Sequence, residues 1–315
     1  MLWVAWRQHR AQAIGAAAVA AVIAVYAVTV GFVIRDAAVD SGLVDCLAEG
    51  RACDLLAMEL LRRFDRTVGL LNFSIWLPLL VGAFFGAPLV ARELERGTHL
   101  LAWTQGVTRG RWLLTRVAVT AAGIVVSMTV LAAGIGWLHD EYYGRAGMPM
   151  SLSTSRFDLH DLTPAALALA TFGIGVMAGV LLRRPLPAMA VSLGLGFGLV
   201  QLVSWLREDL IWPIRLEAPY GEAAARPSDL VVAEGGFLDR SGNEITGEEI
   251  DRLCGASAGL DGFETCLRDA GIQTFALVHP DDRYWILQGL NAAMFLAAGI
   301  LALAVAYWAA VRRPR

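Results

Sequence analysis

The residues best suited to chemistry in this sequence are two histidines that stand beside acids. His139 is followed by Asp140 and Glu141, and His160 is followed by Asp161. Imidazole and carboxylate groups are common ligands of divalent metals, so each group is a candidate metal site. A solvated loop is the more common explanation of such a group, and we favour it. The sequence contains no HExxH, Walker A or CxxC motif, so we predict no catalytic centre, metal or cofactor in this chain.

A second candidate is a surface for binding another protein, in the segment ARELERGTHLLAWTQGVTRGRW at residues 91–112. It combines charges of both signs with an apolar group formed by Leu100, Leu101 and Trp103. An apolar group ringed by charges is typical of a short helix that docks into a groove of a partner. The alternative is an amphipathic helix on anionic lipid, which the two acids of the segment disfavour because the lipid surface is itself negative.

The elements that must position this segment are long and uncharged. Of the 315 residues, 57% are hydrophobic and 17% are charged, whereas soluble proteins carry about a quarter charged residues. Six stretches contain no Asp, Glu, Arg or His, namely residues 11–34, 67–91, 117–138, 162–182, 185–206 and 284–311. A helix needs roughly 20 apolar residues to cross a bilayer. We therefore predict an all-α integral membrane protein with six transmembrane helices, the third beginning near residue 113.

The arginines set the expected orientation, because the chain contains no lysine. With the N-terminus inside, the inner segments have a net charge of +10 and the outer segments a net charge of −13. Basic residues are enriched in short cytoplasmic segments. The first stretch has 24 uncharged residues, more than the roughly 7–15 of a cleavable signal peptide. We expect a multi-pass protein with both termini cytoplasmic, and the Ala-, Gly- and Arg-rich composition favours a bacterial plasma membrane.

The long segment 207–283 predicts a small extracytoplasmic α+β subdomain between the fifth and sixth spans. Its sequence indicates a hairpin that turns at Ser241–Asn243 and a capping box formed by Thr246 and Glu249. We divide the chain into a six-helix transmembrane domain (1–206 with 284–315), a cytoplasmic loop (92–112) and this subdomain. A structural cap over the helices is the favoured role of the subdomain, ahead of a binding module.

All four cysteines fall in segments expected on the outer side. Cys46 and Cys53 lie in the first outer loop, and Cys254 and Cys266 lie in the subdomain. Four cysteines allow three pairings. Local pairing within each loop is the simplest of them and suits an oxidising exterior, with four free buried thiols as the alternative.

Uncharged polar and aromatic residues within the spans offer a possible pathway for an amphipathic solute. Hydrogen bonding between helices and aromatic belts at the membrane surfaces are the more common explanation of such residues. The candidates for lining a pathway are Asn72, Phe73, Trp76, Gln201, Trp205 and Asn291.

The segment 91–112 also resembles the coupling loop of type-2 ATP-binding-cassette (ABC) exporter permeases. That loop has an acid-x-acid-x-Gly-Thr pattern, then leucines, then a Val/Ile-Ser/Thr-Arg step. The pattern falls here on Glu93, Glu95, Gly97, Thr98, Leu100, Leu101, Val107, Thr108 and Arg109. Many relatives have proline just before the Val/Ile, where this chain has Gly106. The opening MLWVAWRQHRAQ and the late HPDDRYWILQ are similar to the actinomycete branch of these permeases.

The resemblance implies that the chain is the membrane subunit of an exporter for a hydrophobic or amphipathic compound. A separate cytosolic ABC ATPase, which holds the ATP and Mg, would dock on the loop. A second permease subunit, identical or different, would complete the pathway. The N-terminal arm, with Trp3 and Trp6, would form an elbow helix along the inner membrane surface. The docking residues would be Glu93, Glu95, Gly97, Thr98, Leu100, Leu101, Trp103 and Arg109.

An alternative reading of the same sequence is a membrane-anchored sensor or immunity protein. Its outer subdomain would bind a ligand and its inner loop would signal to a partner. Both readings involve membrane lipid, and neither involves nucleic acid.

Overall fold

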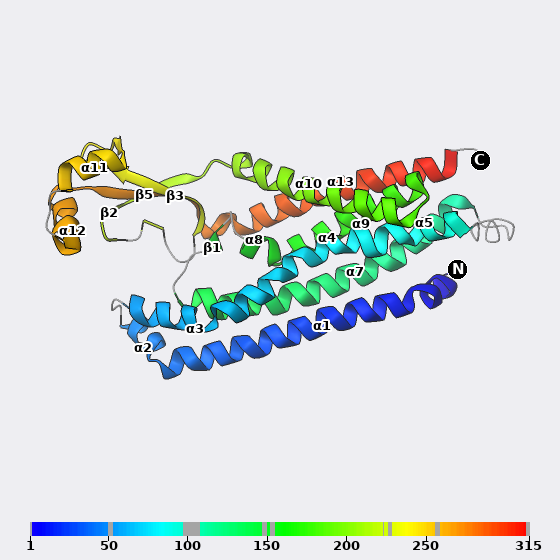
Figure 1. Ribbon diagram of the computed structural model, residues 1–315, viewed down its shortest axis with the longest axis horizontal. Coiled ribbons are helices and arrows are strands. Elements are labelled where there is room, and N and C mark those ends of the chain that lie inside the picture. Colours follow the sequence, from blue (N-terminus) through cyan, green and yellow to red (C-terminus); the bar gives the residue numbers. More distant parts are fainter. Residues whose placement is uncertain are drawn as a thin grey trace.

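The structure is a bundle of long helices with a small sheet-containing subdomain at one end (Figure 1). The computed structural model describes residues 2–49, 53–96, 108–146, 150–151, 155–222, 224–225, 229–255 and 259–312. The start of α1 (Leu2–Asp40) and the end of α13 (Tyr284–Arg312) lie at the end of the bundle opposite the subdomain. The end of α5 (Ala87–Arg96) and the start of α7 (Arg109–His139) lie at that same end.

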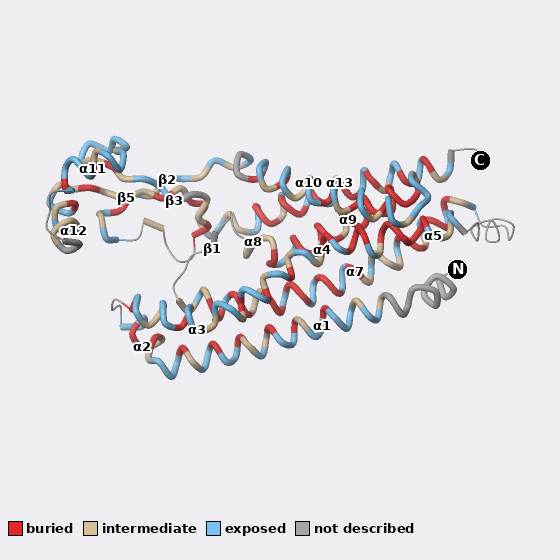
Figure 2. The backbone as a smooth tube through the Cα atoms, in the orientation of Figure 1, coloured by how far each residue is buried: buried red, intermediate tan, exposed pale blue. Residues whose placement is uncertain are grey.

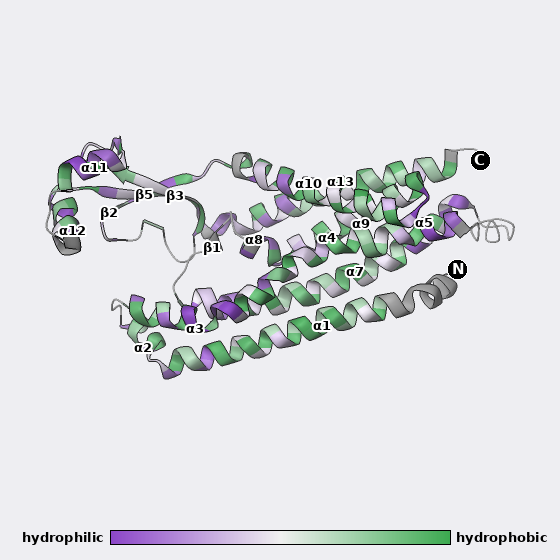
Figure 3. Cartoon of the chain, viewed as in Figure 1, coloured by the Kyte–Doolittle hydropathy of each residue, from purple (hydrophilic) through white to green (hydrophobic). Residues whose placement is uncertain are grey.

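Six helical segments of the described chain are long and apolar enough to cross a membrane. The prediction of a mostly helical protein with six candidate spans is confirmed. The elements that form these segments are α1 (Leu2–Asp40); α3 (Asp54–Asn72), η1 (Phe73–Trp76), α4 (Leu77–Val81), η2 (Gly82–Gly86) and α5 (Ala87–Arg96); α7 (Arg109–His139) with η3 (Asp140–Gly144); α9 (Thr163–Leu182); α10 (Pro185–Leu210); and α13 (Tyr284–Arg312). Figure 3 shows hydrophobic residues along these helices and hydrophilic ones in α11 and at the end of α5.

The first helix differs from the expected elbow. Residues Leu2–Asp40 form one continuous helix, because no proline interrupts the sequence and a single glycine such as Gly15 costs a helix only about 1 kcal/mol. The arm that contains Trp3 and Trp6 is therefore the first part of α1. It is not a separate element.

The fourth span, α9, is the centre of the bundle. It is the most buried of the candidate spans, since 72% of its most apolar 18-residue stretch lies inside the protein. Figure 2 shows this as a concentration of buried residues. Its glycines allow close contact with the second span: a Cβ on Gly175 would lie 2.1 Å from the carbonyl oxygen of Gly82, and one on Gly179 would lie 2.5 Å from that of Ala87. On its other side, Gly173 packs against Gly299 of α13.

The second span is not a regular α-helix. One turn of 3₁₀-helix (η1) and one turn of π-helix (η2) interrupt it, and turns of both kinds leave backbone groups without their usual partners. Thr171 of α9 donates a hydrogen bond to the carbonyl oxygen of Pro78 at 2.6 Å. The irregular part of the second span is therefore held by α9, where the glycine contacts also lie.

The subdomain contains a sheet with strand order β1-β3-β5-β2, and β4 pairs with β3. The strands are β1 (Met150–Ser151), β2 (Ile214–Pro219), β3 (Leu230–Leu238), β4 (Glu244–Ile245) and β5 (Gln273–His279). The pairs β2–β5, β3–β5 and β3–β4 are antiparallel, and β1 pairs with β3 in parallel. The strand β1 lies outside the segment 207–283, so the loop before α9 contributes to the sheet, which the sequence did not indicate.

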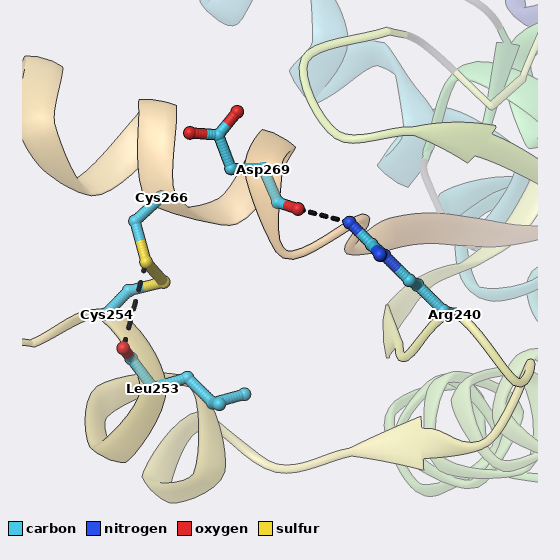
Figure 4. Close-up of a disulfide and its surroundings, with 5 residues drawn as sticks. All are labelled: Arg240, Leu253, Cys254, Cys266 and Asp269. Atoms are coloured by element: carbon cyan, nitrogen blue, oxygen red, sulfur yellow. Dashed lines mark hydrogen bonds between the residues drawn. A yellow bond between two sulfur atoms is a disulfide. The ribbon is translucent and has the colours of Figure 1, made fainter.

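Two short helices, α11 (Gly247–Cys254) and α12 (Gly259–Asp269), complete the subdomain. The predicted capping box is present at the start of α11, with both of its hydrogen bonds. A disulfide joins Cys254 to Cys266, and Arg240 donates to the carbonyl oxygen of Asp269 beside it (Figure 4). A second disulfide joins Cys46 and Cys53, on either side of the turn between α2 (Leu43–Ala48) and α3. Both pairs are the local ones favoured by the sequence.

Candidate functional site

Most of the predicted docking residues lie outside the described part of the chain. The structure does not describe residues 97–107. The predicted docking residues and pattern positions within that range are Gly97, Thr98, Leu100, Leu101, Trp103 and Val107. The two helices that carry the segment are described: α5 ends at Arg96 and α7 begins at Arg109. The side chain of Thr108 caps α7 by accepting a hydrogen bond from the backbone N–H of Arg111 at 3.4 Å.

A partly buried ion pair joins these two helices just beside the segment. Glu93 of α5 accepts a hydrogen bond from the guanidinium of Arg116 on α7. Arg116 is 7% exposed and lies over the ring of Trp112, 5.0 Å from its centroid. The pair joins the end of α5 to α7 close to the two residues between which the segment runs. Of the other predicted docking residues, Glu95 is exposed and Arg109 is partly buried.

At the opposite end of the helices, His139 and His160 are buried, at 3% and 6% exposure. The expectation that both lie in solvated loops is wrong. Nδ1 of His139 lies 3.0 Å from Nε2 of His160, and Nε2 of His139 lies 2.8 Å from Oδ1 of Asn72. The amide oxygen of Asn72 accepts, so His139 carries its proton on Nε2 and its Nδ1 accepts from His160. The end of α3 and the end of α7 are thereby joined to the residues just before α9.

A second set of hydrogen bonds continues across α9 and α13. Thr163 donates to Oε1 of Gln288 at 2.8 Å, and Asn291 donates to the hydroxyl of Thr163 at 3.0 Å. Nε2 of Gln288 donates to the carbonyl oxygen of Phe157 at 3.1 Å. Tyr284 donates to the carboxylate of Asp161. These side chains lie at helix ends that are far apart in sequence.

An ion pair between α8 (Ser155–Leu159) and α10 completes this set. Nη1 of Arg207 lies 2.5 Å from Oδ1 of Asp158, and the two side chains are 6% and 13% exposed. The guanidinium lies 5.4 Å from the centroid of Phe157. We call the whole set the polar belt; its members are Asn72, His139, Asp158, His160, Asp161, Thr163, Arg207, Tyr284, Gln288 and Asn291.

The polar belt is a network of hydrogen bonds and one ion pair. Within the described residues, no group of three or more His, Cys, Asp or Glu side chains is placed to hold a metal ion. The imidazoles of His139 and His160 face each other at hydrogen-bond distance. Burial lowers the pKa of His160, which the carboxylates of Asp140 and Asp161 oppose, and burial also raises the pKa of Asp158.

The histidine pair predicts that acid weakens the fold. Because the pKa of His160 is lowered in the folded protein, its neutral form is the one that folding favours. Its contribution to the free energy of unfolding is complete above the pKa of histidine in the unfolded chain, about 6.5. That contribution is lost as the pH falls below this pKa, by at most roughly 1.4 kcal/mol per pH unit. We expect the unfolding midpoint in detergent to drop between pH 7 and pH 5, and to drop less in His160→Gln. An equal drop in both proteins would contradict this role.

The predicted pathway residues fall into two groups. Asn72 and Asn291 belong to the polar belt, where their amides bind other side chains. The remaining four are exposed on the outer surface of the single chain, with Phe73 at 67% and Trp205 at 65%. Trp76 and Gln201 are exposed in the same way. The structure therefore does not bring the six together around one channel within this chain.

One short sequence pattern matches a motif of hydrolases but lies between different secondary-structure elements. Residues 255–259 read G-A-S-A-G, which fits the G-x-S-x-G turn around the nucleophilic serine of many hydrolases. That turn joins a strand to a helix, whereas here the pattern lies between α11 and α12. Ser257 itself is outside the described residues.

The fold and the belt define a class of protein: a multi-pass helical membrane protein with a small sheet-containing subdomain. Residues 17–207 match the family model described as ABC-2 membrane transporter related. Since the match covers more than half of the chain, the chain belongs to this family of ABC transporter permeases. Searches of the curated proteins and of the solved structures gave no match.

Proposed function

We propose that the chain is the permease subunit of an ABC exporter that moves a hydrophobic or amphipathic compound outward. A separate ATPase chain docks on the segment 92–112, supplies ATP hydrolysis with its own Mg, and works on a pair of permease subunits. The observation that carries the proposal is the partly buried ion pair of Glu93 with Arg116, together with the family match.

The ion pair supports the docking role for a mechanical reason. An ATPase that closes under the membrane must push on a part of the permease that does not yield. Glu93 lies near the end of the second span, whose irregular middle is held on α9 by Thr171. A displacement of the segment would therefore reach α9 through α5, and α7 through Arg116. A loosely attached loop would absorb the same displacement.

The distribution of charge supports the proposed orientation. The start of α1, the end of α13, the end of α5 and the start of α7 share one end of the bundle, and the inner segments expected there are net +10. Positive charge of this kind favours the cytoplasmic side. The disulfides Cys46–Cys53 and Cys254–Cys266 belong to the other end, which suits an oxidising exterior.

The decisive experiment is affinity purification of the tagged chain from its native membranes in mild detergent, with mass spectrometry of the proteins that accompany it. We expect an ATPase with a Walker A motif at a stoichiometric level, and its loss in Trp103→Asp. Trp212→Asp is the matched control, because Trp212 is 87% exposed and lies between α10 and β2 at the other end. Recovery of no ATPase with well-folded protein would overturn the proposal and favour a sensor.

A further inference from the structure

A narrow crevice lies between α1, the second span and α7. It is close to the end of the bundle where α5 ends and α7 begins. Its walls are almost entirely apolar, and it belongs to neither the ion pair of Glu93 nor the polar belt. The residues that matter for its shape are Ala13 and Ala16 of α1, Phe85 of η2, Leu89 of α5, and Thr120 and Gly123 of α7.

The crevice is small and reaches the membrane-facing surface. Its volume is about 40 Å³, room for about three water molecules and less than an aromatic ring requires. Ala13, Ala16 and Gly123 are half-buried, so the crevice opens between α1 and α7 toward the bilayer. A slender hydrocarbon chain could therefore lie in the crevice with its outer side still facing the bilayer, whereas a bulky ring system would not enter it.

The α7 wall of the crevice runs along the helix axis. Beside Val119 it consists of Thr120, Gly123, Ile124, Ser127 and Met128, and these five positions recur along one face of a helix. At 1.5 Å per residue this stripe is about 12 Å long. An acyl chain that lies along the membrane normal has the same direction as the stripe.

One polar atom in the crevice has no partner within the described residues. The hydroxyl of Thr120 is buried and makes no hydrogen bond, whereas the hydroxyl of Ser127 donates to the carbonyl oxygen of Gly123 at 2.9 Å. A hydroxyl left unpaired away from water costs roughly 1–3 kcal/mol. Thr120 lies four residues beyond the buried Arg116 on the same face of α7, about 6 Å deeper in the membrane. The ester carbonyl of a phospholipid lies just below its charged headgroup, at a comparable depth.

We propose that the crevice binds one acyl chain of a membrane phospholipid, with the hydroxyl of Thr120 donating to the ester carbonyl. The chain would lie along Gly123 and Ile124, between Ala13 and Ala16 on one side and Phe85 and Leu89 on the other. The site lies in the leaflet at the α5–α7 end. The assignment of that leaflet to the cytoplasmic side of the membrane is the one part of this proposal that rests on the proposed function.

The test is photolabelling of the purified full-length chain in lipid nanodiscs. The discs contain phosphatidylethanolamine and phosphatidylglycerol, with a small fraction of a phospholipid that carries a diazirine in its acyl chain. After irradiation, mass spectrometry locates the label. We expect labelling of residues 81–89 and 119–128 to exceed that of the exposed faces of α10 and α13 several-fold. Even labelling over all exposed faces would overturn the proposal.

Two variants make the test specific. Gly123→Leu fills the crevice, and its added Cβ meets no atom within 4 Å, so we expect a folded protein with a several-fold loss of label at the crevice. Gly15→Leu is the matched control, since it also meets no atom within 4 Å but lies on the exposed side of α1. Label that persists in Gly123→Leu would overturn the proposal.

The hydroxyl has its own test. Thr120→Val keeps the shape of the crevice and removes the donor. If the ester carbonyl is bound as proposed, labelling at the crevice falls roughly fivefold, the equivalent of one hydrogen bond of about 1 kcal/mol. Unchanged labelling in Thr120→Val would contradict the placement of the ester. None of these measurements needs an ATPase or transport, so their failure is distinct from failure of the proposed exporter function.

Discussion

A Gly175→Val variant is expected not to assemble its transmembrane helices correctly. The Cβ of any side chain at position 175 would lie 2.1 Å from the carbonyl oxygen of Gly82 and 2.8 Å from the backbone nitrogen of Ala87. Both are backbone atoms, so no side-chain rotation relieves the clash, and the second span would have to move away from α9. Overpacking usually costs about 1–3 kcal/mol, and we expect at least the upper part of that range here.

The measurement is the yield of monodisperse protein in mild detergent and its unfolding midpoint. Gly289→Val is the control, because the same substitution is made in α13 where an added Cβ meets no atom within 4 Å. We expect near-normal yield for the control and a large loss for Gly175→Val. Comparable yields of the two proteins would show that α9 and the second span do not pack as closely as the structure describes.

The second large effect is expected from the ion pair of Asp158 with Arg207. Arg207 is 5% exposed, and Asp158→Asn would leave its charge buried without an opposite charge. Removing one partner of a buried pair costs roughly 3–5 kcal/mol. We expect the unfolding free energy in detergent to fall by that amount. The double variant Asp158→Asn/Arg207→Met should recover part of the loss, because it removes the stranded charge.

An exposed pair in the subdomain supplies the comparison. Arg215 lies 3.1 Å from Glu217, with the two side chains 34% and 45% exposed. Exposed pairs of this kind contribute about 0–1 kcal/mol, so Glu217→Gln should have a small effect. If Asp158→Asn costs no more than Glu217→Gln, the polar belt does not hold α8 against α10.

The sequence predicted the helices better than it predicted what lies between them. The uncharged stretches are long enough to be recognised alone, and the hairpin and capping box of the subdomain depend on residues a few positions apart. Likewise, Cys254 and Cys266 are close in sequence. The polar belt depends on which helix ends meet: nothing in the sequence near His139 indicates that His160 and Asn72 are its partners. A usable signal was present, since polar residues recur at the ends of several spans that are otherwise apolar.

For the docking segment, the sequence indicated more than the structure describes. Its pattern of acids, glycine and leucines was recognised from the sequence, yet its central residues lie outside the described chain. The structure adds the ion pair at its base, which the sequence did not suggest because Glu93 and Arg116 are 23 positions apart. Trp112, which the sequence placed at the edge of the segment, is buried beneath Arg116.

The π-turn at Gly82–Gly86 ties the length of the second span to the position of Glu93. A π-turn accommodates one residue more than an α-helical turn, and each residue of an α-helix rotates the chain by about 100°. Because the π-turn absorbs its extra residue locally, deleting one residue there would restore regular geometry and leave the direction of Glu93 largely unchanged. A deletion in the regular part of α5 before Glu93 has no such turn to absorb it, so Glu93 would rotate by about 100° and face away from Arg116. The second span is therefore constrained in its number of residues between the π-turn and Glu93 as strictly as in its apolar character.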